Sequence, residues 1–303
     1  MKGRQISDRV VVGVDGSPEA TAAARYAAAW AALRREPLLL VYAYQPDDPL
    51  PDGPEPDGDA SVSRRRRAAE TVVADVLSQL RLLPALDVEV RAEVGSAASV
   101  LAGLSCEASL VAVGQHRFSI DDQRLSGSVA PLLASVAPCP VVVVPRTWGQ
   151  EAILSRRHPN EGALVVALDG ETDARQALDL VFEQAELRQL PVVALHPNPD
   201  REGSQAETLT LAELVAGYQQ EHPAVRLRTL LLAAQPGDAV VEASRDASML
   251  VVGCPDRRHG PAASRRSVAR SLIGRTHCPL VVVPSVSESG RRRTAASIRS
   301  RRG

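Results

Sequence analysis

Two clusters of residues in the first half of the chain have types and a spacing that suit binding of a phosphorylated ligand. Asp15 directly follows the apolar run RVVVGV, and Val113-Gly114 ends the run SLVAVG. A polar loop then leads to Gly127-Ser128-Val129, where a helix can begin. The start of a helix presents unpaired N–H groups and a partial positive charge, which favour phosphate. Each cluster also has a structural interpretation, because Gly-Ser commonly caps a helix and Asp commonly closes a turn.

Short strands must hold these clusters at one edge of a sheet. Nearly continuous Val/Leu/Ala runs lie near 9–15, 38–44, 86–93, 109–114 and 140–145, with helical segments between them. Such runs are typical of parallel strands buried on both faces, and their alternation with helices predicts a doubly wound α/β sheet. Ser17 and Ser96 are natural starts for two of the helices. Ligands of such sheets bind beyond the carboxyl ends of the strands, where the strand order reverses.

The whole pattern occurs twice. ALVVALDGETDARQALDLVFEQAE, from Ala163, parallels RVVVGVDGSPEATAAARYAAAWAA, from Arg9, and THCPLVVVP parallels APCPVVVVP. The second copy has strand patterns near 163–168, 191–196, 225–232, 249–253 and 279–284. Asp15 to Asp169 is a shift of 154 residues, whereas Gly114 to Gly253 is a shift of 139. The extra residues of the first copy fall in QPDDPLPDGPEPDGDA, which predicts a surface loop.

We therefore predict two tandem Rossmann-like domains, each a five-stranded, mostly parallel sheet flanked by about four helices. The first covers residues 1–146 and the second 162–284, with a linker at 147–161. Residues 285–303 are rich in arginine and have no hydrophobic periodicity, which predicts a disordered basic tail.

The composition excludes several classes of function. The only lysine is Lys2, so a phosphate-binding, Schiff-base or kinase-type lysine cannot lie within the fold. The net charge of −1 provides no overall attraction to DNA or to an anionic membrane, and no apolar run is long enough to span a bilayer. The four cysteines have neither a CxxC nor a zinc spacing, which predicts small buried thiols and no metal site. The expected location is the cytoplasm.

The strings VVVGVDGS, GSAASVLAGLSCEASLVAVG and APCPVVVVP resemble the universal stress protein family. The nucleotide signature of that family is Gly, two residues, Gly, nine residues, then Gly-Ser or Gly-Thr. The first copy matches it with Gly114 and Gly127-Ser128, but Arg117 replaces the second glycine. The resemblance covers nearly all of both copies, apart from the inserted loop, the linker and the tail. It implies domains of the adenine nucleotide alpha hydrolase-like type.

The resemblance also implies an ATP site in the first copy only. Asp15 would lie near the adenosine end, and the main chain of Ala43 would meet the adenine edge. Gly114 would line the approach to the ribose and phosphates, and Mg²⁺ would accompany the nucleotide. Arg117 either fills the pocket or pairs with phosphate oxygens. The implied binding residues are Asp15, Ala43, Val113, Gly114, Arg117, Gly127, Ser128 and Val129.

The second copy departs further from the signature. Asp256 replaces the second glycine and would repel phosphate, while Arg266 places a side chain where bare backbone is needed. His196 is expected opposite Ala43, where it would alter the adenine slot. We expect this copy to be structural.

The predicted function is that of a non-enzymatic, ATP-binding regulatory module of the stress response. The resemblance implies pairing through the edge of the last strand, either between the two copies or in a homodimer, together with protein partners that the sequence does not identify. The alternative is a tandem scaffold that binds no nucleotide and acts through protein contacts. An enzyme that hydrolyses ATP or transfers a group from it is disfavoured, because no carboxylate pair has a recognisable metal-binding spacing and no base is aimed at a nucleophile. Asp121-Asp122 is the only acidic pair near the site that could hold Mg²⁺, and the alternative is a solvated pair in a loop. Absence of GxGxxG argues against a nicotinamide enzyme, and absence of a helix-turn-helix or zinc signature argues against DNA binding.

Overall fold

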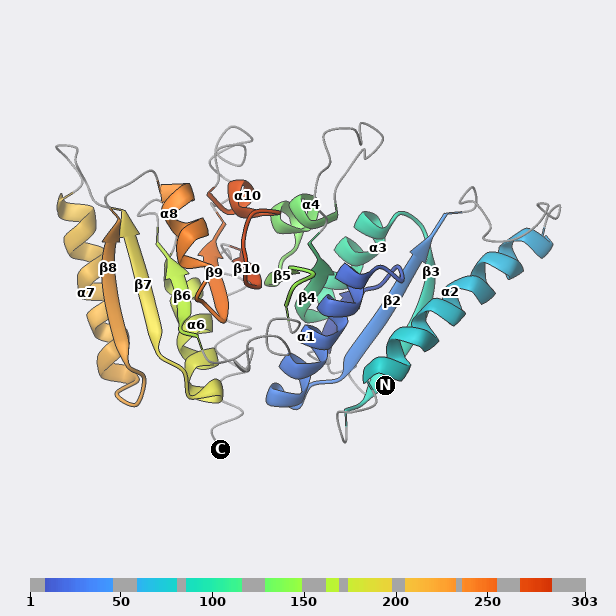
Figure 1. The fold of residues 1–303 in the computed structure, drawn as a ribbon, viewed down its shortest axis with the longest axis horizontal. Helices are drawn as coiled ribbons and strands as arrows, with labels where there is room; N and C mark the ends of the chain where they lie inside the picture. The colour runs from blue at the N-terminus through green and yellow to red at the C-terminus, as the bar shows by residue number, and fades with distance from the viewer. Residues whose placement is uncertain are drawn as a thin grey trace, which may run out of the picture.

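A single sheet of ten strands runs through both copies of the repeat. The computed structural model describes residues 9–45, 59–80, 86–115, 129–148, 162–168, 174–197, 205–232, 236–254 and 268–284. Within these residues the strand order is β3-β2-β1-β4-β5-β10-β9-β6-β7-β8 (Figure 1). All neighbouring strands are parallel except β5 and β10, which are antiparallel where the two copies meet.

Each copy contributes five strands, close to the predicted ranges. The strands of the first copy are β1 (Arg9–Gly13), β2 (Leu38–Tyr44), β3 (Val88–Val94), β4 (Ala108–Gly114) and β5 (Val141–Val144). Those of the second are β6 (Leu164–Ala167), β7 (Val192–Pro197), β8 (Leu227–Leu232), β9 (Met249–Gly253) and β10 (Leu280–Val283). The predicted fold class is confirmed. The prediction that every strand is buried on both faces is wrong for the two edge strands, because Val90, Val94 and Leu230 are exposed there.

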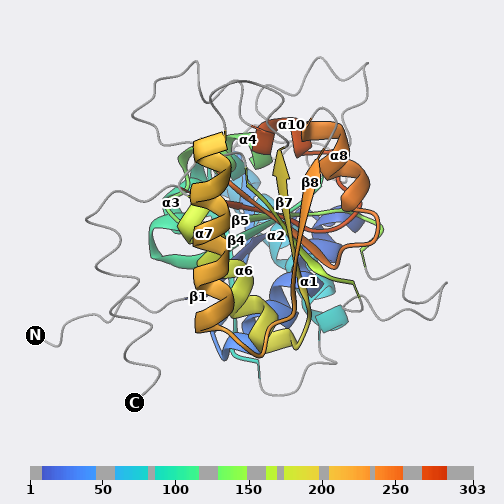
Figure 2. The ribbon, with the colours of Figure 1, turned by 90° about the vertical axis from the view of Figure 1, so that its left-hand side faces the viewer.

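Helices cover both faces of the sheet (Figure 2). The first copy has α1 (Pro18–Arg34), α2 (Asp59–Leu80), α3 (Ala97–Leu104), the short 3-10 helix η1 (Ser105–Glu107) and α4 (Val129–Val136). The second has α6 (Ala174–Arg188), α7 (Gln205–Glu221), α8 (Pro236–Ala243) and α10 (Val268–Leu272). Buried residues of α1, α2, α6 and α7 share one core cluster, and those of α3, α4, α8 and α10 share the other. None of the described helices is long and apolar enough to cross a membrane.

Serine caps begin the helices that the sequence predicted to start at Ser17 and Ser96. The Ser17 hydroxyl accepts a hydrogen bond from the N–H of Ala20 (3.1 Å), and Pro18 occupies the first turn of α1. The Ser96 hydroxyl accepts one from the N–H of Ser99 (3.3 Å) at the start of α3. Both predicted starts are confirmed, because each cap satisfies an N–H that the helix itself leaves unpaired.

The two copies meet through their last strands. Val281 of β10 lies opposite Val142 of β5, and both side chains are fully buried. This arrangement is the pairing that the sequence analysis expected between the copies of a tandem chain.

Side chains of the two copies also contact one another beside the paired strands. The guanidinium of Arg188, in α6, lies 5.6 Å from the ring centre of Trp30 and 5.8 Å from that of Tyr26, both in α1. Arg34 Nη1 of α1 lies 2.6 Å from Glu183 Oε1 of α6. Burial raises the pKa of Tyr26 to about 12, so its phenol stays neutral at physiological pH. The contacts between the copies therefore include ionic and aromatic pairs as well as apolar strands.

Candidate functional site

The strand order creates a topological switch point in the first copy. From β1 the chain proceeds outward through β2 to β3, and then returns to the other side of β1 as β4. Val12 of β1 is in register with Leu40 of β2 and with Ala112 of β4. The carboxyl ends of these three strands consequently lie side by side, which is where open α/β sheets bind ligands.

Asp15 lies at this edge, in the turn between β1 and α1. The last main-chain bond of β1 runs from the N–H of Val14 to the carbonyl of Val41 (2.9 Å). The Asp15 carboxylate accepts a hydrogen bond from the N–H of Ser17 (2.9 Å), and Gly16 adopts φ +83°, which favours glycine. Asp15 therefore stabilises the turn, which is the structural role that the sequence analysis gave as the alternative to ligand binding. Its side chain is also exposed at the switch point, where a ligand could reach it.

The main chain of Ala43 is directed toward the same region. Along β2 the carbonyl of Val41 accepts from the β1 side, whereas the carbonyl of Tyr44 accepts from Gly95 on the β3 side (2.8 Å). Main-chain groups of a strand alternate in direction, so the N–H and carbonyl of Ala43 are directed to the β1 side. They lie beyond the last β1–β2 pair, Gly13 with Val41. This position suits a polar ligand edge that bonds to the backbone.

Gly114 has a packing role that the sequence analysis did not foresee. A Cβ atom at this position would lie 2.6 Å from the carbonyl carbon of Glu19 and 2.8 Å from the nitrogen of Ala20. The first turn of α1 therefore packs directly against the end of β4, which leaves no room for a side chain. Access for a ligand is not needed to explain this glycine.

Val113 and Val129 flank the site without exposing reactive groups. The side chain of Val113 is buried in the core on the α3 and α4 side, so only its main chain faces the strand ends. Val129 begins α4 and is partly buried against the same core. Arg117, Gly127 and Ser128 lie outside the described residues, as does Asp121-Asp122. Their roles remain predictions.

The second copy differs at the position equivalent to Ala43. Val10 is in register with Leu38, and Leu164 is in register with Val192, so both copies have the same spacing between their first two strands. The residue equivalent to Ala43 is therefore Pro197, and the expectation that His196 would occupy this position is wrong. Proline has no N–H, so this strand end lacks the donor that Ala43 supplies. Asp169, Asp256 and Arg266 lie outside the described residues.

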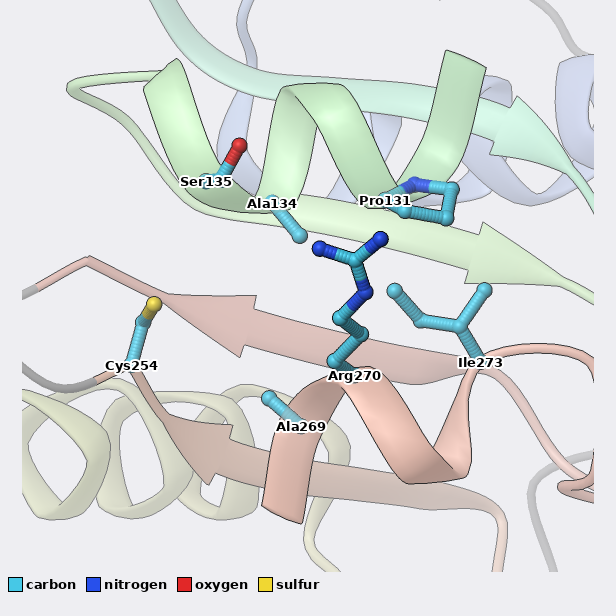
Figure 3. Close-up of a pocket in the computed structure, with 7 residues that line it drawn as sticks. All are labelled: Pro131, Ala134, Ser135, Cys254, Ala269, Arg270 and Ile273. Carbon is cyan, nitrogen blue, oxygen red and sulfur yellow. The ribbon is translucent and has the colours of Figure 1, made fainter. Parts of the chain in front are cut away.

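A shallow groove lies at the junction of the two copies. Figure 3 shows it between α4 and α10, with the Arg270 guanidinium between the two helices. Its lining residues are Pro131, Ala134, Ser135, Cys254, Ala269, Arg270 and Ile273. The groove is mostly apolar and includes none of the predicted binding residues.

The cysteines only partly match the expected buried thiols. Burial raises the pKa of both Cys139 and Cys278 to about 12, so these thiols stay protonated. Cys106 is exposed in η1, which contradicts the expectation. Among the described residues no group of His, Cys, Asp and Glu side chains could hold a metal ion.

Comparison with known proteins identifies relatives that cover most of the chain. The sequence profile of the universal stress protein family matches residues 7–145 and 162–284. A universal stress protein of Mycobacterium tuberculosis is 30% identical over 295 residues, covering 90% of this chain and 95% of that protein. The crystal structure of a universal stress protein from Archaeoglobus fulgidus covers 92% of this chain and 98% of its own, with 16% identity and a TM-score of 0.69. A second structure from that organism, in complex with dAMP, is 26% identical and covers 40% of this chain and 97% of its own, with a TM-score of 0.33.

Proposed function

Because the chain belongs to the universal stress protein family, we propose that its first copy binds an adenine nucleotide such as ATP at the switch point beside β1. The observation that carries the proposal is the position of the exposed Asp15 and of the Ala43 main chain at the ends of β1 and β2, beside the end of β4 at Gly114. The exposed carboxylate of Asp15 suits a ribose hydroxyl. The main chain of Ala43 suits the polar edge of a base, because it supplies one donor and one acceptor.

The phosphates are assigned to Gly127, Ser128 and Val129 by the spacing of the signature. A helix that begins at Val129 directs its first N–H groups and its partial positive charge toward the preceding residues. Arg117 is proposed to pair with phosphate oxygens, and Mg²⁺ to arrive with the nucleotide.

The second copy is proposed to bind no nucleotide. Pro197 removes the donor at the adenine edge, and Asp256 and Arg266 interrupt the signature. This copy would instead serve as the partner on which the first copy packs. The chain as a whole is proposed to be a binding module of the stress response rather than a catalyst, working in the cytoplasm and reporting the nucleotide state to protein partners.

We expect Gly127→Glu to weaken ATP binding by at least about tenfold, which corresponds to about 1.4 kcal/mol. The added carboxylate would repel the phosphates and fill the space that a glycine leaves for them. Isothermal titration calorimetry on the folded full-length protein, with and without Mg²⁺, measures the dissociation constant.

Arg266→Glu is the matched control, because Arg266 occupies the equivalent position of the second copy. Its affinity for ATP should equal that of the wild type. Equal affinities of Gly127→Glu and the wild type would refute the assigned phosphate position. A well-folded wild type that binds no nucleotide would leave a tandem scaffold acting through protein contacts.

A further inference from the structure

Gln115 connects the end of β4 to the second copy. It directly follows Gly114, and its N–H donates to the carbonyl of Val144 (2.7 Å). Its side-chain amide crosses the junction, where Nε2 donates to the carbonyl of Thr276 (3.3 Å). The hydroxyl of Thr276 donates in return to Oε1 of Gln115 (3.4 Å). The sequence does not reveal this pair, because the two residues are 161 positions apart and the motifs that contain them do not indicate a side-chain contact.

Both partners are buried, so the contact is costly to break. Gln115 is 8% exposed and Thr276 is 3% exposed. A buried amide that loses its partners costs about 1–3 kcal/mol, because water cannot replace them. The amide of Gln115 therefore fixes the main chain of β4 where the strand leaves the sheet, one residue beyond Gly114.

The same pair of hydrogen bonds cannot form in the opposite direction. A shift of 139 residues relates Gln115 to Cys254 and Ala137 to Thr276. The main chains of the two copies are hydrogen-bonded alike at these positions, since the N–H of Cys254 donates to the carbonyl of Val283 (2.8 Å) as the N–H of Gln115 donates to the carbonyl of Val144. A thiol and a methyl group, however, cannot form the paired hydrogen bonds of an amide and a hydroxyl. The second copy therefore holds the strand end of the first copy, without being held by the first copy in the same way.

We propose that Gln115 is a positioning residue through which the second copy holds the β4 side of the nucleotide site and is coupled to its occupancy. This inference rests on the proposed function of the first copy. It gives the second copy a role although its own signature is interrupted. The turn before β10, which contains Thr276, would hold Gln115 in place and would itself become more ordered when the nucleotide binds. Coupling of this kind is reciprocal in free energy, so whatever releases Gln115 from Thr276 also weakens nucleotide binding.

A double-mutant cycle on the full-length protein tests the proposal. Gln115→Leu removes both hydrogen bonds and should weaken ATP binding about fivefold in calorimetry. Thr276→Val removes only the hydroxyl and should weaken binding less, since the carbonyl acceptor remains. In the Gln115→Leu background, Thr276→Val should add nothing, because its effect on the site passes through Gln115. Cys254→Ala, the matched control at the equivalent position, should bind ATP like the wild type.

Amide hydrogen exchange at saturating ATP separates coupling from a merely structural role. In the wild type and in Cys254→Ala, ATP should slow exchange both in the turn of Asp15 and in the turn of Thr276. In Gln115→Leu, protection at Asp15 should persist and protection at Thr276 should disappear.

The outcomes are distinguishable. If the wild type binds ATP, an unchanged affinity of Gln115→Leu would overturn this inference and leave the proposed function intact. Protection of the Thr276 turn that persists in Gln115→Leu would do the same. Absence of ATP binding in the folded wild type would overturn both.

Discussion

Val281→Asp is expected to lower the free energy of unfolding by at least about 4 kcal/mol and to separate the two copies. Val281 is fully buried where β10 pairs antiparallel with β5, opposite Val142. It belongs to a core cluster of buried apolar residues, so a carboxylate there would be placed among apolar groups. A buried charge without a partner is among the most costly changes that a core can receive.

Chemical denaturation followed by circular dichroism measures this effect. Val90→Asp is the matched control, because Val90 is 40% exposed on the edge strand β3. The same substitution should lower stability there by only about 1 kcal/mol, mainly through the poor strand propensity of aspartate. Equal stability of the two variants would show that β5 and β10 do not hold the copies together in solution.

Gly114→Val is expected to destabilise the protein by about 3 kcal/mol. The added Cβ would approach the main chain of Glu19 and Ala20 to within 2.6–2.8 Å, and backbone atoms cannot give way as a flexible side chain can. Movement of α1 away from β4 would also displace the turn of Asp15, so the variant should lose nucleotide binding along with stability.

Gly103→Val separates this clash from the general effect of replacing a glycine. A Cβ atom at Gly103, in α3, meets nothing within 4 Å. Valine and glycine differ by only about 0.5 kcal/mol in helix propensity, so this variant should retain nearly wild-type stability. Thermal unfolding of both variants checks the difference. A Gly114→Val protein as stable as Gly103→Val would mean that α1 does not pack against β4 as described.

The sequence predicted the fold well, because the strands are nearly continuous apolar runs and the repeat supplied each of them twice. Ten strands lie close to their predicted ranges, and the helix starts at Ser17 and Ser96 follow from local capping. Burial was overestimated for β3 and β8, since an apolar run does not show whether a strand lies at the edge of its sheet.

The site was less predictable, because its details depend on register and on contacts between distant segments. The predicted equivalent of Ala43 was His196 and the observed one is Pro197. This error of one residue in register cannot be detected from the spacing of apolar runs. Gly114 appeared to serve a ligand because the turn of α1 against which it packs lies almost a hundred residues earlier. The pairing of Gln115 with Thr276 arises only when the two copies meet.

The stoichiometry of ATP binding to the wild-type chain tests the central claim most directly. The claim is that the first copy binds an adenine nucleotide and the second does not, because Pro197 and the interrupted signature remove the contacts that Ala43 and Gly127 supply. Calorimetric titration of a known concentration of folded protein should give one ATP per chain with a single affinity. Two sites per chain, or none, would contradict the account.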